Sequence, residues 1–245
     1  MLSAGDIAKY VLTPGDPARV HKIAAKLLDA RKVADNRGIV SFTGSYEGVE
    51  VSAVSTGVGC PSAAIVVEEL ARVGAETIIR VGTTGGMQED VKPGDIVIPI
   101  AATRSDGTTR AYVSEQYPAV ASLDVTQALV SSATRMGFKP HVGIVWTSDS
   151  YYAESGPMLD SWVKAGVISV EMECSAIFTL TRIRGLRSGA ILAVDGNLLK
   201  GTKKLEYDEG DPARQQREEK VQRAIDSEIE IALKAVRDLS RKVDK

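Results

Sequence analysis

Short apolar runs alternate with segments of helical periodicity along most of the chain. The runs have the length of strands, and several are apolar at nearly every position. A strand of that kind is buried on both faces, as in parallel sheets that are covered by helices. The expected strands are residues 10–13, 39–43, 49–55, 76–81, 95–100, 142–146, 167–170 and 190–194. The turn Tyr46-Glu47-Gly48 predicts that the second and third of them form a hairpin.

Helix signals lie between these strands. Pro17 suits a first helical turn, and the apolar residues after Pro61 recur at helical spacing. The expected helices are residues 17–28, a segment that opens at Pro61, 119–136, a segment from Glu173 to about 184, and a charged amphipathic helix that closes the chain. The alternation predicts an α/β fold with one domain over residues 1–245. Its central sheet is mixed, mostly parallel and flanked by helices, and ligands are expected at the carboxyl ends of the strands.

Two polar stretches interrupt this alternation. Residues 104–116 are expected to form a surface loop or an excursion from the fold. Residues 200–211 are polar and contain glycine, so we expect a mobile segment that is suited to act as a lid.

Composition narrows the class of protein. The 245 residues are 44% hydrophobic and 25% charged, as in an ordinary globular protein, and the formal net charge is −2. That charge gives no reason to expect a nucleic acid or an anionic membrane as a partner. The start lacks the pattern of a signal peptide and no apolar run has the length of a membrane span, so a cytoplasmic location is expected. The two cysteines have no metal-ligand spacing, and buried free thiols are expected.

The most informative segment is Arg80-Val81-Gly82-Thr83-Thr84-Gly85, which continues a predicted strand. A guanidinium gives bidentate, charge-assisted contacts to phosphate oxygens. Glycines let backbone N–H groups approach an anion, and threonines add hydroxyl donors. The segment therefore predicts a phosphate site at the end of this strand.

Two other segments carry weaker signals for an anion. Gly15 and Arg19 flank the start of the helix at Pro17, where free N–H groups and the helix dipole favour phosphate. An ordinary strand-to-helix turn with a surface arginine explains the same pattern. Arg37, in Asn36-Arg37-Gly38, is by itself typical of a solvated turn.

The segment Gly57-Val58-Gly59 follows a strand and precedes a helix, which invites a dinucleotide-binding interpretation. The third glycine of that motif is replaced by Ser62, and the acidic residue at about the right distance, Glu76, begins a strand instead of ending one. Close backbone packing is the better explanation.

Glu171-Met172-Glu173 ends an apolar strand, where carboxylates are scarce unless they are used. A buried carboxylate must be paired or hydrogen-bonded. Vicinal ribose hydroxyls are suitable donors, and a structural carboxylate at a helix N-terminus is the alternative for Glu173.

Asp195 ends the last apolar strand and precedes Gly196. A strand-end carboxylate is a candidate general acid, and an ordinary Asp-Gly turn is the alternative. Tyr151 and Tyr152 are candidates for stacking on a planar base or for a place in the core or a lid.

In chain order, these motifs resemble the hexameric nucleoside phosphorylase family, whose members include purine nucleoside, uridine and methylthioadenosine phosphorylases. The resemblance rests on PGDPxR, NRG, GVGxPS, RVGTTG, SDxYY, VEME and VDG, and it covers almost the whole chain. It implies phosphorolysis of a nucleoside to the free base and ribose 1-phosphate, without a metal or organic cofactor, with phosphate as co-substrate. It also implies homo-oligomers in which dimers assemble to a hexamer.

The resemblance assigns roles to individual residues. Phosphate would be held by Gly15, Arg19, Arg80 and Thr83, and by Arg37 of a neighbouring subunit. Ribose would be held by Met172 and Glu173 with Glu171 nearby, and the base site would include Thr84, Gly85, Tyr151 and Asp195. Asp195 would act as general acid and Arg80 would position the nucleophile.

Two departures from the family are visible. Many members carry a histidine near the N-terminus that reaches a neighbour's ribose 5′-hydroxyl, but this chain has none before His21. Bacterial purine enzymes usually have serine followed by aspartate where this chain has Asp195-Gly196. The pattern in this chain is similar to that of the apicomplexan purine nucleoside phosphorylase.

The nucleobase of the substrate is inferred from residues 154–166 and from Asp195. Uridine phosphorylases usually have glutamine and arginine that read the pyrimidine edge, and residues 154–166 contain neither. We therefore expect purine nucleosides, with inosine and guanosine favoured by Asp195. Uridine and methylthioadenosine remain alternatives, as do a nucleoside hydrolase, a non-catalytic nucleoside-binding or nucleotide-dependent protein, and a Rossmann-type oxidoreductase.

Overall fold

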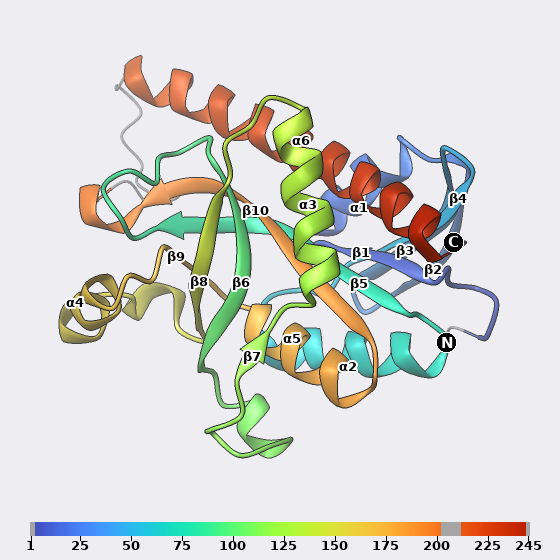
Figure 1. Ribbon diagram of the computed structural model, residues 1–245, viewed down its shortest axis with the longest axis horizontal. Helices are drawn as coiled ribbons and strands as arrows, with labels where there is room; N and C mark the ends of the chain where they lie inside the picture. The colour runs from blue at the N-terminus through green and yellow to red at the C-terminus, as the bar shows by residue number, and fades with distance from the viewer. Residues whose placement is uncertain (1–2, 202–211, 244–245) are drawn as a thin grey trace.

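The computed structural model describes residues 3–201 and 212–243, which form a mixed sheet with helices on both sides (Figure 1). The strands are β1 (Tyr10–Thr13), β2 (Leu28–Asn36), β3 (Ile39–Tyr46), β4 (Val49–Val54), β5 (Thr77–Gly86), β6 (Ile96–Ser105), β7 (Ala119–Val120), β8 (His141–Ser148), β9 (Ser169–Glu171) and β10 (Arg187–Asn197). The helices are α1 (Pro17–Ala24), α2 (Cys60–Arg72), α3 (Leu123–Arg135), α4 (Gly156–Lys164), α5 (Cys174–Ile183) and α6 (Pro212–Val243). The predicted α/β class and mixed sheet are confirmed.

The sheet consists of a closed circuit of strands and an extension from it. Strands β5, β10, β6, β8 and β9 pair in a closed circuit, because β10 pairs with β5 as well as with β6. From β5 the sheet continues through β1, β4, β3 and β2. The neighbours β4, β1, β5 and β10 are parallel to one another, so their carboxyl ends meet at one edge.

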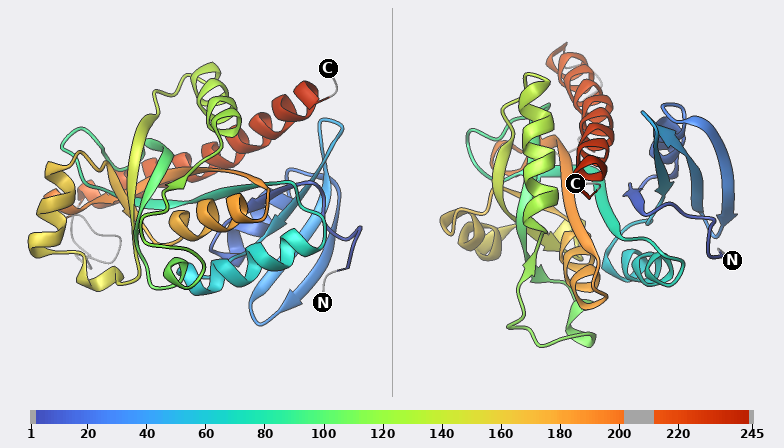
Figure 2. Two further views of the ribbon diagram at one scale, coloured as in Figure 1. Left: turned by 60° about the horizontal axis from the view of Figure 1, so that its bottom comes forward. Right: turned by 45° about the vertical axis from the view of Figure 1, so that its right-hand side comes forward.

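Two apolar layers lie on opposite sides of these parallel strands. One layer joins the strands to α1, α3 and α6, and the other joins them to α2 and α5. In both views α3 and α6 lie on one side of the sheet, with α2 and α5 on the other (Figures 1 and 2). Successive side chains alternate between the layers, as at Ile191 and Leu192 of β10. This double burial explains why the strands read as continuous apolar runs.

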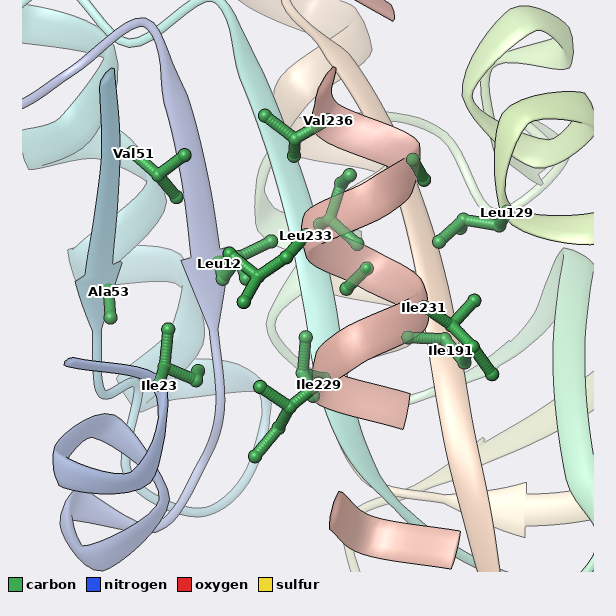
Figure 3. Packing of buried hydrophobic residues seen from close by; sticks show 14 of the residues in the cluster. Leu12, Ile23, Val51, Ala53, Leu129, Ile191, Ile229, Ile231, Leu233 and Val236 are labelled. Atoms are coloured by element: carbon green, nitrogen blue, oxygen red, sulfur yellow. The ribbon is translucent and has the colours of Figure 1, made fainter. Parts of the chain in front are cut away.

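Helix α6 carries much of the first layer. Its residues Ile229, Leu233 and Val236 are buried, and they pack toward Leu12 of β1 and Ile191 of β10 (Figure 3). The charged helix expected at the end of the chain is thus an integral part of the core.

Some predicted boundaries are wrong for identifiable reasons. Helix α1 ends at Ala24 and not at residue 28 as predicted. The apolar Leu27 fits the helical pattern, but its side chain is buried just after the end of the helix. Residues 119–120 form the short strand β7 instead of the first turn of α3. The strands β5, β6 and β10 each continue into polar residues beyond the apolar run that predicted them.

Two elements are missing from the prediction. Strand β2 is mostly exposed and polar, so it has no apolar periodicity, and its pairing with β3 defines it. Helix α4 contains no buried residue. Within 104–116 a short helix, Thr109–Ala111, forms the expected excursion beyond β6. Of the segment 200–211 that was expected to be a mobile lid, residues 202–211 lie outside the described residues.

Replacing Leu233 by alanine tests the contribution of α6. The side chain is 0% exposed, so Leu233→Ala should lower the free energy of unfolding by about 2–5 kcal/mol through lost burial and a residual cavity. The adjacent Lys234→Ala is the matched control, because it removes only a long, partly exposed ion pair with Glu230 and should change stability by less than about 1 kcal/mol. Equal effects in denaturant titrations would show that α6 is not part of the core.

Candidate functional site

A cleft of about 680 Å³ lies at the carboxyl ends of β1, β5 and β10. It brings together segments that are far apart in the sequence. The predicted site residues that line it are Gly15, Arg19, Arg80, Thr83, Thr84, Gly85, Tyr151, Glu171, Met172, Glu173 and Asp195. Parallel register explains part of the convergence, since Arg80 of β5 is paired with Thr13 of β1 and Ala190 of β10.

Arg80 lies at the centre of this arrangement and is 4% exposed. Its Nε donates to Oε2 of Glu171 at 3.0 Å, and its Nη2 pairs with Oε2 of Glu173 at 2.5 Å. Burial disfavours the charged form of Arg80, but the attraction of Glu173 and Glu171 outweighs it and raises the pKa of the guanidinium. Arg80 is therefore a permanent, fixed cation, and its Nη1 has no hydrogen-bond partner among the described residues.

Gly82 is required by the position of this guanidinium. A Cβ atom at residue 82 would lie 2.8 Å from Cζ of Arg80 and 3.0 Å from both terminal nitrogens. The glycine of the predicted phosphate segment thus makes room for the arginine two residues before it.

Glu171 holds both Arg80 and the start of α5. Its Oε2 accepts from the backbone N–H groups of Glu173 and Cys174 at 2.8 and 2.9 Å, and its Oε1 accepts from Thr147 Oγ1 at 2.6 Å. The side chain is 0% exposed. Its oxygens are fully engaged by the protein, so the geometry gives Glu171 the task of positioning Arg80.

Glu173 has a different environment. Its Oε1 accepts from the backbone N–H of Gly59 at 2.6 Å, while Arg80 lies against the other oxygen. Burial raises the pKa of Glu173 above its ordinary value, with Arg80 opposing that shift and Glu171 adding to it. Glu173 and Met172 lie together on the wall of the cleft.

The glycine loops that follow β1 and β4 are joined to each other by their backbones. Thr56 and Gly57 donate to the carbonyl oxygens of Pro14 and Gly15 at 2.8 and 3.1 Å. Ser62, the residue that breaks the dinucleotide-binding pattern, donates to the carbonyl of Thr56 at 2.5 Å. The loop is therefore closed by its own packing, as the sequence indicated.

Arg19 joins the cleft to helix α6. Its Nη1 donates to the carbonyl of Val81 at 3.1 Å and lies 3.5 Å from Oε1 of Glu228. Sequence reasoning missed Glu228, because one glutamate in a charged helix carries no signal of burial. It also passed over Glu154, which is 5% exposed on the cleft wall, and Thr147, which supports Glu171.

The predicted base-binding residues Thr84, Gly85, Tyr151 and Asp195 also line the cleft. Asp195 is an additional residue in β10, because the register with β5 shifts between Val194 and Gly196. Such a bulge redirects a side chain and is common beside active sites. Burial and the charges of Asp195 and Glu154 raise the pKa of Tyr151. Thr84 uses its hydroxyl to donate to the carbonyl of Val170 at 2.7 Å.

Arg37 lies elsewhere. It occupies the turn between β2 and β3 with a φ of 54° and is exposed, outside the residues that line the cleft. Its predicted contact with phosphate requires a second subunit and stays a prediction.

The cleft thus brings together the guanidinium groups of Arg19 and Arg80, the carboxylates of Glu171 and Glu173, and Tyr151 with Asp195. Residues 9–234 match the Phosphorylase superfamily. The chain therefore belongs to that superfamily and, within it, to the nucleoside phosphorylases.

Individual relatives agree on the class and differ in the nucleoside of their names. A guanosine phosphorylase of Halorubrum lacusprofundi is 42% identical over 92% of this chain and 93% of its own length. A uridine phosphorylase of Thermococcus kodakarensis is 44% identical over 79% of this chain and 74% of its own length. The crystal structure of a uridine phosphorylase from Vibrio fischeri has a TM-score of 0.89 at 31% identity and covers 97% of this chain and 94% of that one.

Among residues 3–201 and 212–243, none of the helices has the length and apolar character of a membrane span.

Gly82→Ala tests the fixed position of Arg80. The added methyl group must displace the guanidinium from its two carboxylates, so kcat/KM for phosphate should fall by about 10- to 100-fold while the fold is retained. Gly107→Ala is the matched control, because a Cβ there meets nothing closer than 3.9 Å. Unchanged phosphate kinetics in Gly82→Ala would show that the guanidinium position is not needed.

Proposed function

We propose that this protein catalyses the phosphorolysis of purine nucleosides, with inosine and guanosine as preferred substrates. The carboxyl group of Asp195 carries the purine assignment. It stands on a bulge beside Tyr151, where it can donate a proton to a leaving base. The guanosine phosphorylase relative, which matches over nearly the full length of both chains, supports the same choice.

In the proposed reaction, inorganic phosphate binds beside the two guanidinium groups that line the cleft. Arg19, Arg80, Thr83 and the backbone at Gly15 hold it, and Arg37 of a neighbouring subunit adds a further contact. Phosphate attacks the anomeric carbon as the glycosidic bond breaks through an oxocarbenium-like state. Fixed guanidinium groups position this nucleophile, and the bound anion stabilises the positive charge that develops on the sugar.

The sugar lies between phosphate and base. We assign the ribose hydroxyls to the ionised Glu173, with Met172 against the sugar and Glu171 as the positioning residue behind Arg80. The protonated form of Asp195 donates to N7 of a purine as the bond breaks, which leaves a neutral base. Tyr151, Thr84 and Gly85 complete the base site. The residues supply this chemistry without a metal or organic cofactor.

Uridine is the second candidate. The Thermococcus kodakarensis and Vibrio fischeri relatives are both named uridine phosphorylases, and methylthioadenosine is a further alternative within the purines. The proposed role of Arg37 requires a second subunit, and we propose the homo-oligomer that the family resemblance implies, in which dimers assemble to a hexamer.

A substrate panel decides between these nucleosides. With phosphate present, kcat/KM should be higher for inosine and guanosine than for methylthioadenosine and uridine, because discrimination is a ratio of these values. If uridine exceeds every purine by about tenfold or more, the purine assignment is wrong. Release of base without phosphate would instead indicate a hydrolase, and binding without release would indicate a non-catalytic protein.

Asp195→Asn tests the general acid. The amide cannot deliver the proton, so kcat/KM for inosine should fall by about 10²- to 10⁴-fold, while phosphate affinity stays nearly unchanged. Asp90→Asn, a change at an exposed carboxylate, serves as the control. A value for Asp195→Asn within about threefold of the parent would remove Asp195 from the mechanism.

A further inference from the structure

Glu228 is a fully buried carboxylate that the reaction described above does not use. It lies on α6 and is 0% exposed, and neither of its oxygens makes a hydrogen bond of good geometry. Its nearest cation is Arg19 of α1, whose Nη1 is 3.5 Å from Oε1. An ionised carboxylate in such surroundings depends mainly on that guanidinium for its stability.

The groups that face Glu228 come from three other elements. Burial raises the pKa of Glu228 to about 8, and Arg19, the backbone N–H of Ala193 and Arg80 oppose the shift, while Asp195 adds to it. Near pH 8 the carboxyl is thus balanced between its neutral and ionised forms, and a small change in the surrounding charge shifts that balance.

Arg19 has two sides. It lines the cleft at the proposed phosphate position, and its Nη1 also lies 3.5 Å from Oε1 of Glu228. A phosphate dianion on this guanidinium would place a second anion close to Glu228 in a region with little water. Repulsion between the two anions disfavours the ionised carboxylate.

We propose that Glu228 takes up a proton from solvent when phosphate binds, so that Arg19 exchanges one anionic partner for another. The carboxylate becomes a neutral carboxylic acid, and it loses the proton again when the anion leaves. Glu228 is therefore a positioning residue that acts through Arg19. This inference rests on the proposed phosphate site.

The sign of the pH dependence follows from linkage. The phosphate-bound protein holds more protons than the free protein, so phosphate affinity should fall as pH rises through the pKa of the free form. Glutamine at position 228 is neutral at every pH and imitates the protonated state. Between pH 7 and pH 9 the affinity of the parent relative to Glu228→Gln should drop by roughly tenfold, a change that a merely structural role would not produce.

Calorimetry measures the proton directly. The protein is titrated with inorganic phosphate at pH 8 in two buffers that differ in ionisation enthalpy, and the number of protons taken up per phosphate is calculated. At a pH equal to the pKa of about 8 half of the Glu228 carboxyls are ionised, so the parent should take up about half a proton more than Glu228→Gln. The ionisation of phosphate itself is the same in both proteins and cancels. Glu230→Gln, on the same helix but partly exposed and paired with Lys26, should behave like the parent.

Equal proton uptake by the parent and Glu228→Gln, with phosphate bound in both, would overturn the inference and leave the proposed function standing. Failure of phosphate to bind the parent would overturn the proposed function itself. A titration of the parent with sulfate, which does not ionise near pH 8, needs no variant. Sulfate that binds at this site without proton uptake would also overturn the inference.

Discussion

The burial of Arg80 between Glu171 and Glu173 is the constraint on which the rest of the site depends. A guanidinium at 4% exposure is stable only if its charge is matched, and the carboxylates at the end of β9 and at the start of α5 provide the match. Because Glu171 also receives the first N–H groups of α5, the cation, the strand end and the helix start are fixed as one unit. The site is thereby organised before any ligand arrives.

The closed circuit of strands gives this unit its surroundings. Since β1, β5 and β10 are parallel, their last residues meet, and the polar extensions of the strands become the walls of the cleft. Helix α6 crosses behind the same edge and contributes Glu228 to Arg19. The helix that completes the core therefore also sets the charge behind the proposed phosphate position.

The proposed phosphate-binding and base-binding residues differ in how firmly the structure holds them in place. Arg19 and Arg80 are both held by buried carboxylates, and relatives named for guanosine and for uridine share this class of reaction. Among the proposed base-binding residues, Asp195 is itself the single inserted residue in β10. A change of one position there redirects a carboxylate, so the choice of base can differ among similar chains while phosphate chemistry is retained.

The sequence by itself determined the α/β class, the main strands and a set of site residues that all line the cleft except Arg37, because double burial and turn chemistry leave local patterns. It did not predict β2 or α4, whose residues are largely exposed, nor the ends of β5 and β10, where polar residues are held by pairing. Only the tertiary structure decided that Glu171 supports Arg80 and that Glu228 is buried against Arg19. Those roles arise from contacts between segments 91 and more than 200 residues apart, and no local pattern records them.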